Sequence, residues 1–214
     1  MRLYDYAASG NCFKVRLLLG LLGRPYERVP VDIFAGDTLT SEFAAINPLR
    51  ETPVLELDSG ERLAQSSAIL WYLASGTRFL PDGALERAQV VSWLSFEQER
   101  VMGGLGNPRF RLLTGRDATG IDSRLATGRG ALTVLDAHLD ARSYVVGASP
   151  TIADLGLFPY VSVAGDAGID LGDWPQVTAW LDRIRALPGF VDDFVTYPDN
   201  ARPGVSRSIY DSAA

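Results

Sequence analysis

The chain has 214 residues, of which 47% are hydrophobic and 21% are charged, and its formal net charge is −6. This length and composition allow a sizeable buried core and are comfortable for two domains. The net negative charge disfavours nucleic acid and anionic membranes as partners, because no overall positive field attracts them. With one cysteine, Cys12, and one histidine, His138, the chain has no internal disulfide, and we expect no metal site.

We expect a cytoplasmic protein. A single cysteine is typical of a reducing compartment. The longest apolar run, residues 15–22, is far too short to span a bilayer and lacks the basic start and cleavage site of a signal peptide.

Residues 1–75 alternate between strand and helix patterns. A helix separates the first two strands, so we predict that they pair in parallel through a right-handed crossover. Gly23 ends the first helix, and Ser66 is placed to be the N-cap of the last one. The predicted elements are strands at 2–6 and 26–31 around a helix at 13–22, a helical turn at 41–46, a hairpin of 53–57 and 62–65, and a helix at 66–74. This order predicts an α/β domain over residues 1–75.

The rest of the chain has helical patterns. A turn-rich segment at 75–83 marks the boundary, so we predict a linker at 76–84 and an all-helical domain at 85–214. Thr151 is the predicted N-cap of one helix, and Asp154 completes its capping box. The positions predicted to be buried are Val90, Val91, Leu94 and Met102 on one helix, Leu132, Leu135 and Leu139 on the next, and Trp174, Val177, Trp180, Leu181 and Ile184 near the end.

Two short polar motifs are candidates for binding or chemistry. Ser9, Asn11 and Cys12 lie between the first strand and its helix. Gln65 and Ser66 begin a later helix, where unpaired N–H groups and the helix dipole favour a bound carboxylate.

Three other features have structural interpretations when they are taken alone. Pro53 belongs at the entry of a strand or in a cis turn, because proline disrupts pairing inside a strand. The glycine-rich stretch 103–110 lacks the preceding strand and the lysine of a phosphate-binding loop, so we reject that function. We expect His138 to be structural or exposed.

Taken together, several motifs resemble the cytosolic glutathione S-transferases over nearly the whole chain. They are "SGNC" at 9–12, "NPLRETPVLEL" at 47–57, "LAQSSAILWYLA" at 63–74, "TIAD" at 151–154 and "WPQVTAWLDRIRALPGF" at 174–190. The resemblance implies an α/β thioredoxin-like N-terminal domain that binds glutathione, and an all-α C-terminal domain. It also implies that glutathione is the co-substrate and that the protein is a homodimer.

The resemblance assigns roles around the glutamyl and cysteinyl parts of glutathione. Gln65 and Ser66 match the pair that holds the γ-glutamyl end. Pro53 matches a cis-proline that precedes the residue whose backbone pairs with the cysteinyl part, here Val54. The implied glutathione-binding residues are Arg50, Thr52, Pro53, Val54, Gln65 and Ser66.

The glycine end of glutathione carries a second carboxylate. Arg50 is its expected basic partner. Glu51 stands where many relatives have glutamine, and an acid at this position opposes the carboxylate.

The resemblance also identifies the reactive residue of the tetrad at 9–12. In thioredoxin-like relatives the first position of this tetrad is the exposed one, and here it is Ser9. Serine-type transferases of the theta and zeta classes carry their active serine at this position, and the nu class has an asparagine that matches Asn11. We predict that Ser9 and Asn11 are catalytic and stabilise the thiolate of glutathione by hydrogen bonds. Cys12, at the more buried position, is predicted to have a packing role.

The leading hypothesis is therefore the conjugation of glutathione to a small hydrophobic electrophile. We expect the second substrate to lie against Phe96, Gln98, Met102 or Phe110, with Tyr210 of the C-terminal tail as a cover. Two alternatives use the same site: disulfide reduction of the nu type and isomerisation of the zeta type. A third is a non-catalytic binding or regulatory protein of the same fold.

Overall fold

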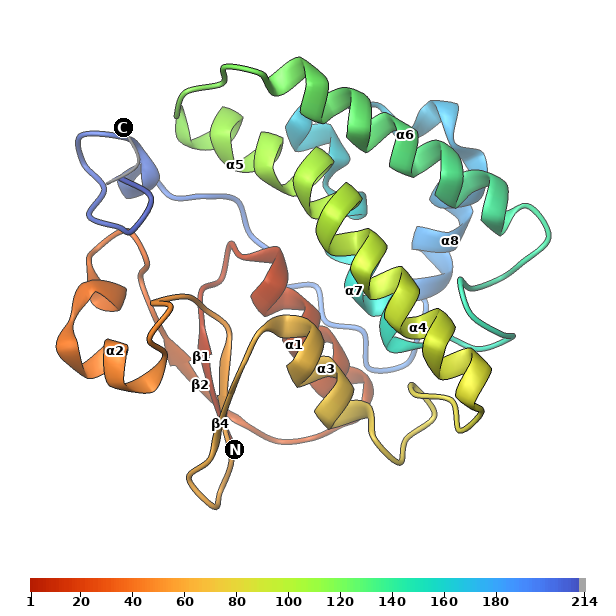
Figure 1. The fold of residues 1–214 in the computed structure, drawn as a ribbon, viewed down its shortest axis with the longest axis horizontal. Helices are drawn as coiled ribbons and strands as arrows, with labels where there is room; N and C mark the ends of the chain where they lie inside the picture. The colour runs from red at the N-terminus through yellow and green to blue at the C-terminus, as the bar shows by residue number, and fades with distance from the viewer. Residues whose placement is uncertain (212–214) are drawn as a thin grey trace.

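The structure, a computed structural model, describes residues 1–211 and combines a four-stranded sheet with a larger set of helices (Figure 1). The strand order is β2-β1-β3-β4. β1 and β2 pair in parallel, as predicted, while β3 pairs antiparallel with β1 and with β4, which completes the predicted hairpin. The strands are β1 (Arg2–Asp5), β2 (Glu27–Pro30), β3 (Val54–Glu56) and β4 (Arg62–Ala64). This mixed sheet confirms the thioredoxin-like prediction for the first domain.

Three helices accompany the sheet: α1 (Gly10–Leu21), α2 (Ser41–Ile46) and α3 (Ser66–Ala74). α1 is almost wholly buried because two helices pack against it: α3, and α7 (Ile152–Ser162) from the helical domain. The prediction that Ser66 caps α3 was wrong: Gln65 is the N-cap, and Ser66 is the first helical residue. The Ser66 hydroxyl donates to Asn11 (3.4 Å) instead of accepting a helix N–H.

The second domain is helical, which confirms the predicted fold class. Its first three segments follow one another without interruption as α4 (Ala84–Phe96), a π-helical stretch (Glu97–Gly106) and α5 (Asn107–Thr114), and Figure 1 shows them as one long rod. The remaining helices are α6 (Ile121–Leu139), α7 (Ile152–Ser162) and α8 (Pro175–Arg185), with short 3-10 turns at Ala164–Ala167, Leu171–Asp173 and Asp199–Ala201. Another 3-10 turn, Asp37–Leu39, precedes α2 in the first domain.

Most predictions of helix capping and of buried positions in the second domain are confirmed. The capping box of Thr151 and Asp154 is present at the start of α7, and the positions predicted to be buried on α6 and α8 are buried. Val91 is an error, because 49% of it is exposed while Val90 is buried. Neighbouring residues on a helix point about 100° apart, and Val90 is the one that faces the core.

The segment after α8 returns to the first domain. Gly189 and Val191 pack against Gly20 of α1, and Ala35 forms a β-bridge with Arg207. In Figure 1 this last segment ends near α2 and α5. Within residues 1–211, none of the helices combines the length and apolar character needed to cross a bilayer.

Candidate active site

Ser9 is the N-cap of α1 and lies in the loop that follows β1. Its backbone is extended (φ −82°, ψ 121°), and its Oγ accepts a hydrogen bond from the backbone N–H of Cys12 (3.3 Å). The backbone N–H of Ser9 donates to the carbonyl of Tyr6 (3.0 Å). Since capping uses a lone pair of the hydroxyl oxygen, the hydroxyl hydrogen is available to another acceptor.

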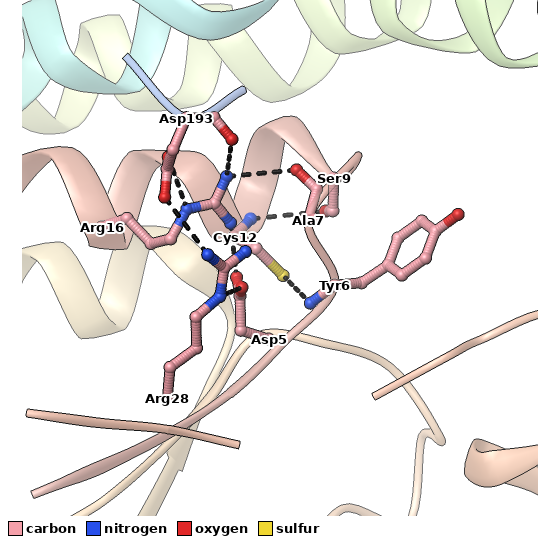
Figure 2. A network of polar contacts seen from close by, with 8 residues as sticks. All are labelled: Asp5, Tyr6, Ala7, Ser9, Cys12, Arg16, Arg28 and Asp193. Atoms are coloured by element: carbon pink, nitrogen blue, oxygen red, sulfur yellow. Dashed lines mark hydrogen bonds and ion pairs between the residues drawn. The ribbon is translucent and has the colours of Figure 1, made fainter. Parts of the chain in front are cut away.

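An ionic cluster around the buried Arg16 and Asp5 lies beside this loop (Figure 2). Arg16 on α1 donates from Nη1 to Asp5 Oδ1 at the end of β1 (2.5 Å), and from Nη2 to the carbonyl of Ala7 (3.1 Å). Arg28 of β2 also pairs with Asp5. Asp193, in the returning C-terminal segment, accepts from Arg16 Nε (2.9 Å) and Arg28 Nη1 (3.3 Å). The cluster therefore ties β1, β2, α1 and the segment around Asp193 together beside the loop.

Arg109 of α5 holds the same loop from the helical domain. Its Nη1 donates to the carbonyl of Ala8 (3.2 Å), and its Nη2 donates to the carbonyl of Val195 (3.3 Å). Its Nε pairs with Asp166 (2.8 Å). Both domains thus fix the position of the loop that carries Ser9.

The side chains of Asn11 and Cys12 differ in their surroundings. Asn11 lines a cavity between the two domains, and its Oδ1 accepts from Lys14 Nζ (2.8 Å) and from Ser66 Oγ (3.4 Å). Cys12 is fully buried and its Sγ accepts from the backbone N–H of Tyr6 (3.4 Å). Burial raises the pKa of the Cys12 thiol to about 11 in spite of these hydrogen bonds, so the thiol is protonated at neutral pH. This placement agrees with the predicted packing role of Cys12.

The residues predicted to bind glutathione surround the start of α3. The Thr52–Pro53 peptide is cis, one of the two conformations expected for Pro53. Gln65 (φ 71°) and Arg50 (φ 57°) have left-handed backbones, which are uncommon for residues other than glycine and concentrate at functional sites. A small hollow of about 30 Å³ is lined by Asn11, Asn47, Glu51, Thr52, Pro53, Gln65 and Ser66.

This hollow adjoins a cavity of about 380 Å³ between the two domains, and the two share Asn11, Glu51, Thr52 and Gln65. The larger cavity is lined by Tyr6, Ser9, Asn11, Ile33, Thr38, Arg50, Glu51, Thr52, Gln65, Gln98, Met102, Gly106, Asn107, Phe110, Tyr160, Tyr197 and Tyr210. The structure therefore brings most of the predicted site residues to one place. Tyr210 lies at the cavity, as expected for a cover.

Two of the predicted site residues lie outside both hollows. The side chain of Val54 is fully buried in β3, and its predicted role, which uses the backbone, stays a prediction. Thr52, on the other side of Pro53, lines the cavity. Phe96 packs edge-on against Trp93 (5.1 Å between ring centroids) and lines an open hollow between α4 and α6. Side chains two positions apart on a helix point about 200° from each other, so Phe96 faces away from the cavity wall to which Gln98 contributes.

Three tyrosines of the cavity wall were missed. Tyr6 follows β1, Tyr160 lies in the apolar pattern of α7, and Tyr197 belongs to a C-terminal segment without periodicity. Burial raises the pKa of all three phenols. Tyr210 is 41% exposed, and its partial burial together with the nearby carboxylate of Glu51 raises its pKa to about 12. The four hydroxyls are therefore neutral hydrogen-bonding groups at physiological pH.

Comparison with known proteins agrees with this fold and site. Residues 8–75 match the family model of the glutathione S-transferase N-terminal domain, and residues 118–183 match that of the C-terminal domain. The chain belongs to the glutathione S-transferase family.

Three relatives illustrate the range of the matches. A maleylacetoacetate isomerase of Rhizobium meliloti is 33% identical over 94% of this chain and 97% of its own. The disulfide-bond oxidoreductase YfcG of Escherichia coli is 30% identical over 86% and 89%. The crystal structure of a possible glutathione S-transferase from Rhodopseudomonas palustris is 40% identical over 92% and 98%, with a TM-score of 0.87.

Proposed function

We propose that this protein is a glutathione transferase in which Ser9 stabilises the glutathione thiolate for attack on a small hydrophobic electrophile. The geometry of Ser9 carries this proposal, because its oxygen already accepts the Cys12 N–H and its hydroxyl hydrogen is available to an anion in the cavity. A free thiol has a pKa of about 8.5, and the thiolate is the nucleophile. One or two hydrogen bonds to the anion, worth roughly 1.4 to 2.7 kcal/mol, lower this pKa by about one to two units.

The conjugation step needs no protein base. The thiol proton leaves to solvent, the sulfur forms a bond to an electrophilic carbon, and the leaving group departs with its bonding electron pair. Among the described residues that line the cavity, Arg50 is the one cation and Glu51 the one anion, and they are neighbours beside Thr52. The wall contributed by Met102 and Phe110 is uncharged, which favours a neutral electrophile over a carboxylate.

Glutathione is placed by the groups around α3. The N-terminus of α3, at Gln65 and Ser66, favours the γ-glutamyl carboxylate through its unpaired N–H groups and dipole. Arg50 donates from Nη1 to the carbonyls of Thr38 (2.8 Å) and Thr40 (3.0 Å). These bonds hold the guanidinium at the cavity and leave its other N–H groups for the glycine carboxylate.

The test compares the wild type with Ser9→Ala and Ser9→Thr. With 1-chloro-2,4-dinitrobenzene as electrophile, we expect kcat/KM to fall about 10- to 100-fold in Ser9→Ala, the loss of one hydrogen bond to an anion, and to be largely retained in Ser9→Thr. The calorimetric Kd of glutathione should stay within about threefold in Ser9→Ala. Unchanged turnover in Ser9→Ala overturns the assignment. A wild type that binds glutathione without turnover, or does not bind it, favours the non-catalytic alternative.

Isomerisation and disulfide reduction remain the second candidate, because the relatives include proteins named for these reactions. Both start from the same glutathione thiolate. In disulfide reduction the thiolate attacks one sulfur and releases the other as a thiolate, and a second glutathione then completes the exchange. Turnover of bis(2-hydroxyethyl) disulfide that exceeds turnover of the aryl halide would favour the reductase.

We also propose that the chain forms a homodimer. An open hollow between α3 and α4 is lined in part by Trp71, Val91 and Leu94, and 49% of Val91 is exposed. Such an apolar surface is suited to a partner subunit. Sedimentation should give a species near twice 23.2 kDa, and a 23.2 kDa species at micromolar concentration would overturn the dimer.

A further inference from the structure

Two charged side chains, Lys14 of α1 and Glu97 at the start of the π-helical stretch, are completely buried between the two domains. Lys14 Nζ and Glu97 Oε2 are 2.9 Å apart, and neither side chain has any exposed surface. Removing both charges from water is costly, so a buried ion pair is weak evidence for a stabilising role. The other contacts of Lys14 and Glu97 therefore indicate the role of this ion pair.

Burial lowers the pKa of Lys14, and the adjacent Glu97 opposes that shift; in its charged form the ammonium group has three donors and no acceptor. One N–H reaches Glu97, a second donates to Asn11 Oδ1 (2.8 Å), and the group lies 5.4 Å from the ring centroid of Tyr160. Glu97 Oε2 also accepts from Gln98 Nε2 (2.8 Å), a residue of the cavity wall. The pair thus forms a bridge from the electrophile side of the cavity to Asn11.

These contacts determine which way the Asn11 amide faces. The oxygen and nitrogen of an asparagine side chain are usually assigned from their hydrogen-bond partners. Lys14 Nζ donates and cannot accept, and Ser66 Oγ donates to the same oxygen (3.4 Å). With Oδ1 held in this way, the Nδ2 hydrogens of Asn11 are the groups left to meet a ligand in the cavity that Asn11 lines.

We propose that Lys14, held by Glu97, is a positioning residue that fixes the Asn11 amide with its N–H group toward the glutathione sulfur, beside the Ser9 hydroxyl. This inference rests on the proposed function, because it needs a thiolate near Ser9. Without Lys14, the amide is able to turn its oxygen toward the sulfur and repel the anion. Lys14 acts through Asn11 and does not itself touch the substrate.

The test measures the thiol pKa of bound glutathione from the thiolate absorbance near 240 nm. Lys14→Met combined with Glu97→Gln removes both charges together, so that no unpaired charge is left buried. We expect this double variant to raise the bound thiol pKa by about one unit, the loss of one hydrogen bond to an anion. Asn11→Ala should raise it by a similar amount.

A mutant cycle separates positioning from a general effect on the structure. In the Asn11→Ala background, Lys14→Met with Glu97→Gln should add less than about 0.3 units, because the interaction it supports is already lost. Full additivity, or no change in the thiol pKa of the double variant, overturns the proposal. The proposed function fails separately, if wild-type glutathione binds without a lowered thiol pKa or if Ser9→Ala leaves that pKa unchanged.

A second measurement needs no change in the ion pair and covers the case in which the double variant does not fold. The side-chain ¹⁵N–H signals of Asn11 are identified as those missing in Asn11→Ala. They should shift downfield when glutathione binds and shift less with S-methylglutathione, which cannot form a thiolate. Equal shifts with the two ligands would contradict the proposed orientation.

Discussion

At the scale of single residues, Cys12 and Ser9 show how three positions in a helix decide between chemistry and packing. Both lie at the start of α1, where the helix dipole acidifies an exposed thiol. The side chain of Cys12 instead points into the core, and burial raises its pKa to about 11. Ser9, outside the first turn, keeps its hydroxyl at the cavity. We therefore predict that the residue with the more reactive functional group, Cys12, takes no direct part in the chemistry.

The raised pKa of the buried Cys12 thiol predicts that the stability of the protein depends on pH. The thiol of Cys12 titrates near 9.0 when unfolded and near 11 when folded, so it contributes fully to stability below pH 9 and loses that contribution as the pH rises to 11. The unfolding free energy of the wild type should therefore fall faster than that of Cys12→Ala, by roughly 1.4 kcal/mol per pH unit in this range.

Urea unfolding of wild type and Cys12→Ala at pH 8, 9 and 10 measures the effect. At pH 7, kcat/KM of Cys12→Ala should stay within about twofold of the wild type, since no hydrogen bond to the anion is lost. A large loss of turnover with intact folding would restore Cys12 as a candidate for direct chemistry.

At the scale of elements, the long rod of α4, the π-helical stretch and α5 forms one wall of the cavity. Gly104 in this rod is buried and lies against Gly128 of α6, so closely that a Cβ on Gly104 would come within 2.4 Å of the Gly128 backbone nitrogen. Gly103, one residue earlier, has nothing within 4 Å of its would-be Cβ. Helix packing therefore explains Gly104, and the stretch is helical and has no phosphate-loop geometry.

The two adjacent glycines give a matched pair of predictions. Gly104→Ala should destabilise the protein by about 2 kcal/mol or more, because backbone and not a flexible side chain stands in the way. Gly103→Ala should be neutral or stabilise by up to about 1 kcal/mol, the usual helical gain of alanine over glycine. Thermal and urea unfolding of both variants measure the difference. Equal effects would show that the contact between the rod and α6 is looser than described.

At the scale of the whole molecule, the predictable features were those that depend on neighbours in the sequence. The parallel β1–β2 pair, the β3–β4 hairpin and the capping box of Thr151 and Asp154 all follow from local signals. The errors at Val91 and Phe96 arose because a helix face was assigned without knowing its partner helix.

The last segment, 186–211, gave no sequence signal for its position. Its contacts are with residues far away in the chain, such as Arg16 with Asp193 and Asp32 with Asn200. No periodic pattern records such contacts, which is why Tyr197 was missed at the cavity. The same segment nevertheless closes the site on one side.

One cation holds the end of this segment in place. Arg116 donates to the carbonyl of Ala201, to Ser206 Oγ (3.0 Å) and to Asp211 Oδ1 (2.7 Å). Its guanidinium also lies 5.2 Å and 5.0 Å from the ring centroids of Phe34 and Phe110, one from each domain. Because Tyr210 lines the cavity next to these contacts, we predict that Arg116 keeps the tail over the end of the cavity where the second substrate is expected.

Arg116→Met should release the tail while leaving the glutathione end intact. We expect the KM of the electrophile to rise about tenfold and that of glutathione to stay within about twofold, since a hydrogen bond to a charged group is worth about 1.5 kcal/mol or more. Trypsin should cut faster after Arg202 and Arg207, because local release exposes both sites.

Arg111→Met is the matched control, because Arg111 lies near Arg116 in the chain, at the end of α5, but reaches only the nearby carbonyl of Asp117 among the described residues (2.5 Å). It should change neither KM nor the cleavage rate by more than about twofold, because its hydrogen bond to the Asp117 carbonyl is local and does not reach the tail. If the tail of Arg116→Met resists trypsin as well as the wild type does, the apolar contacts of Tyr210 hold it without the cation. If the tail is released and both KM values stay constant, Tyr210 covers the cavity without contacting the second substrate.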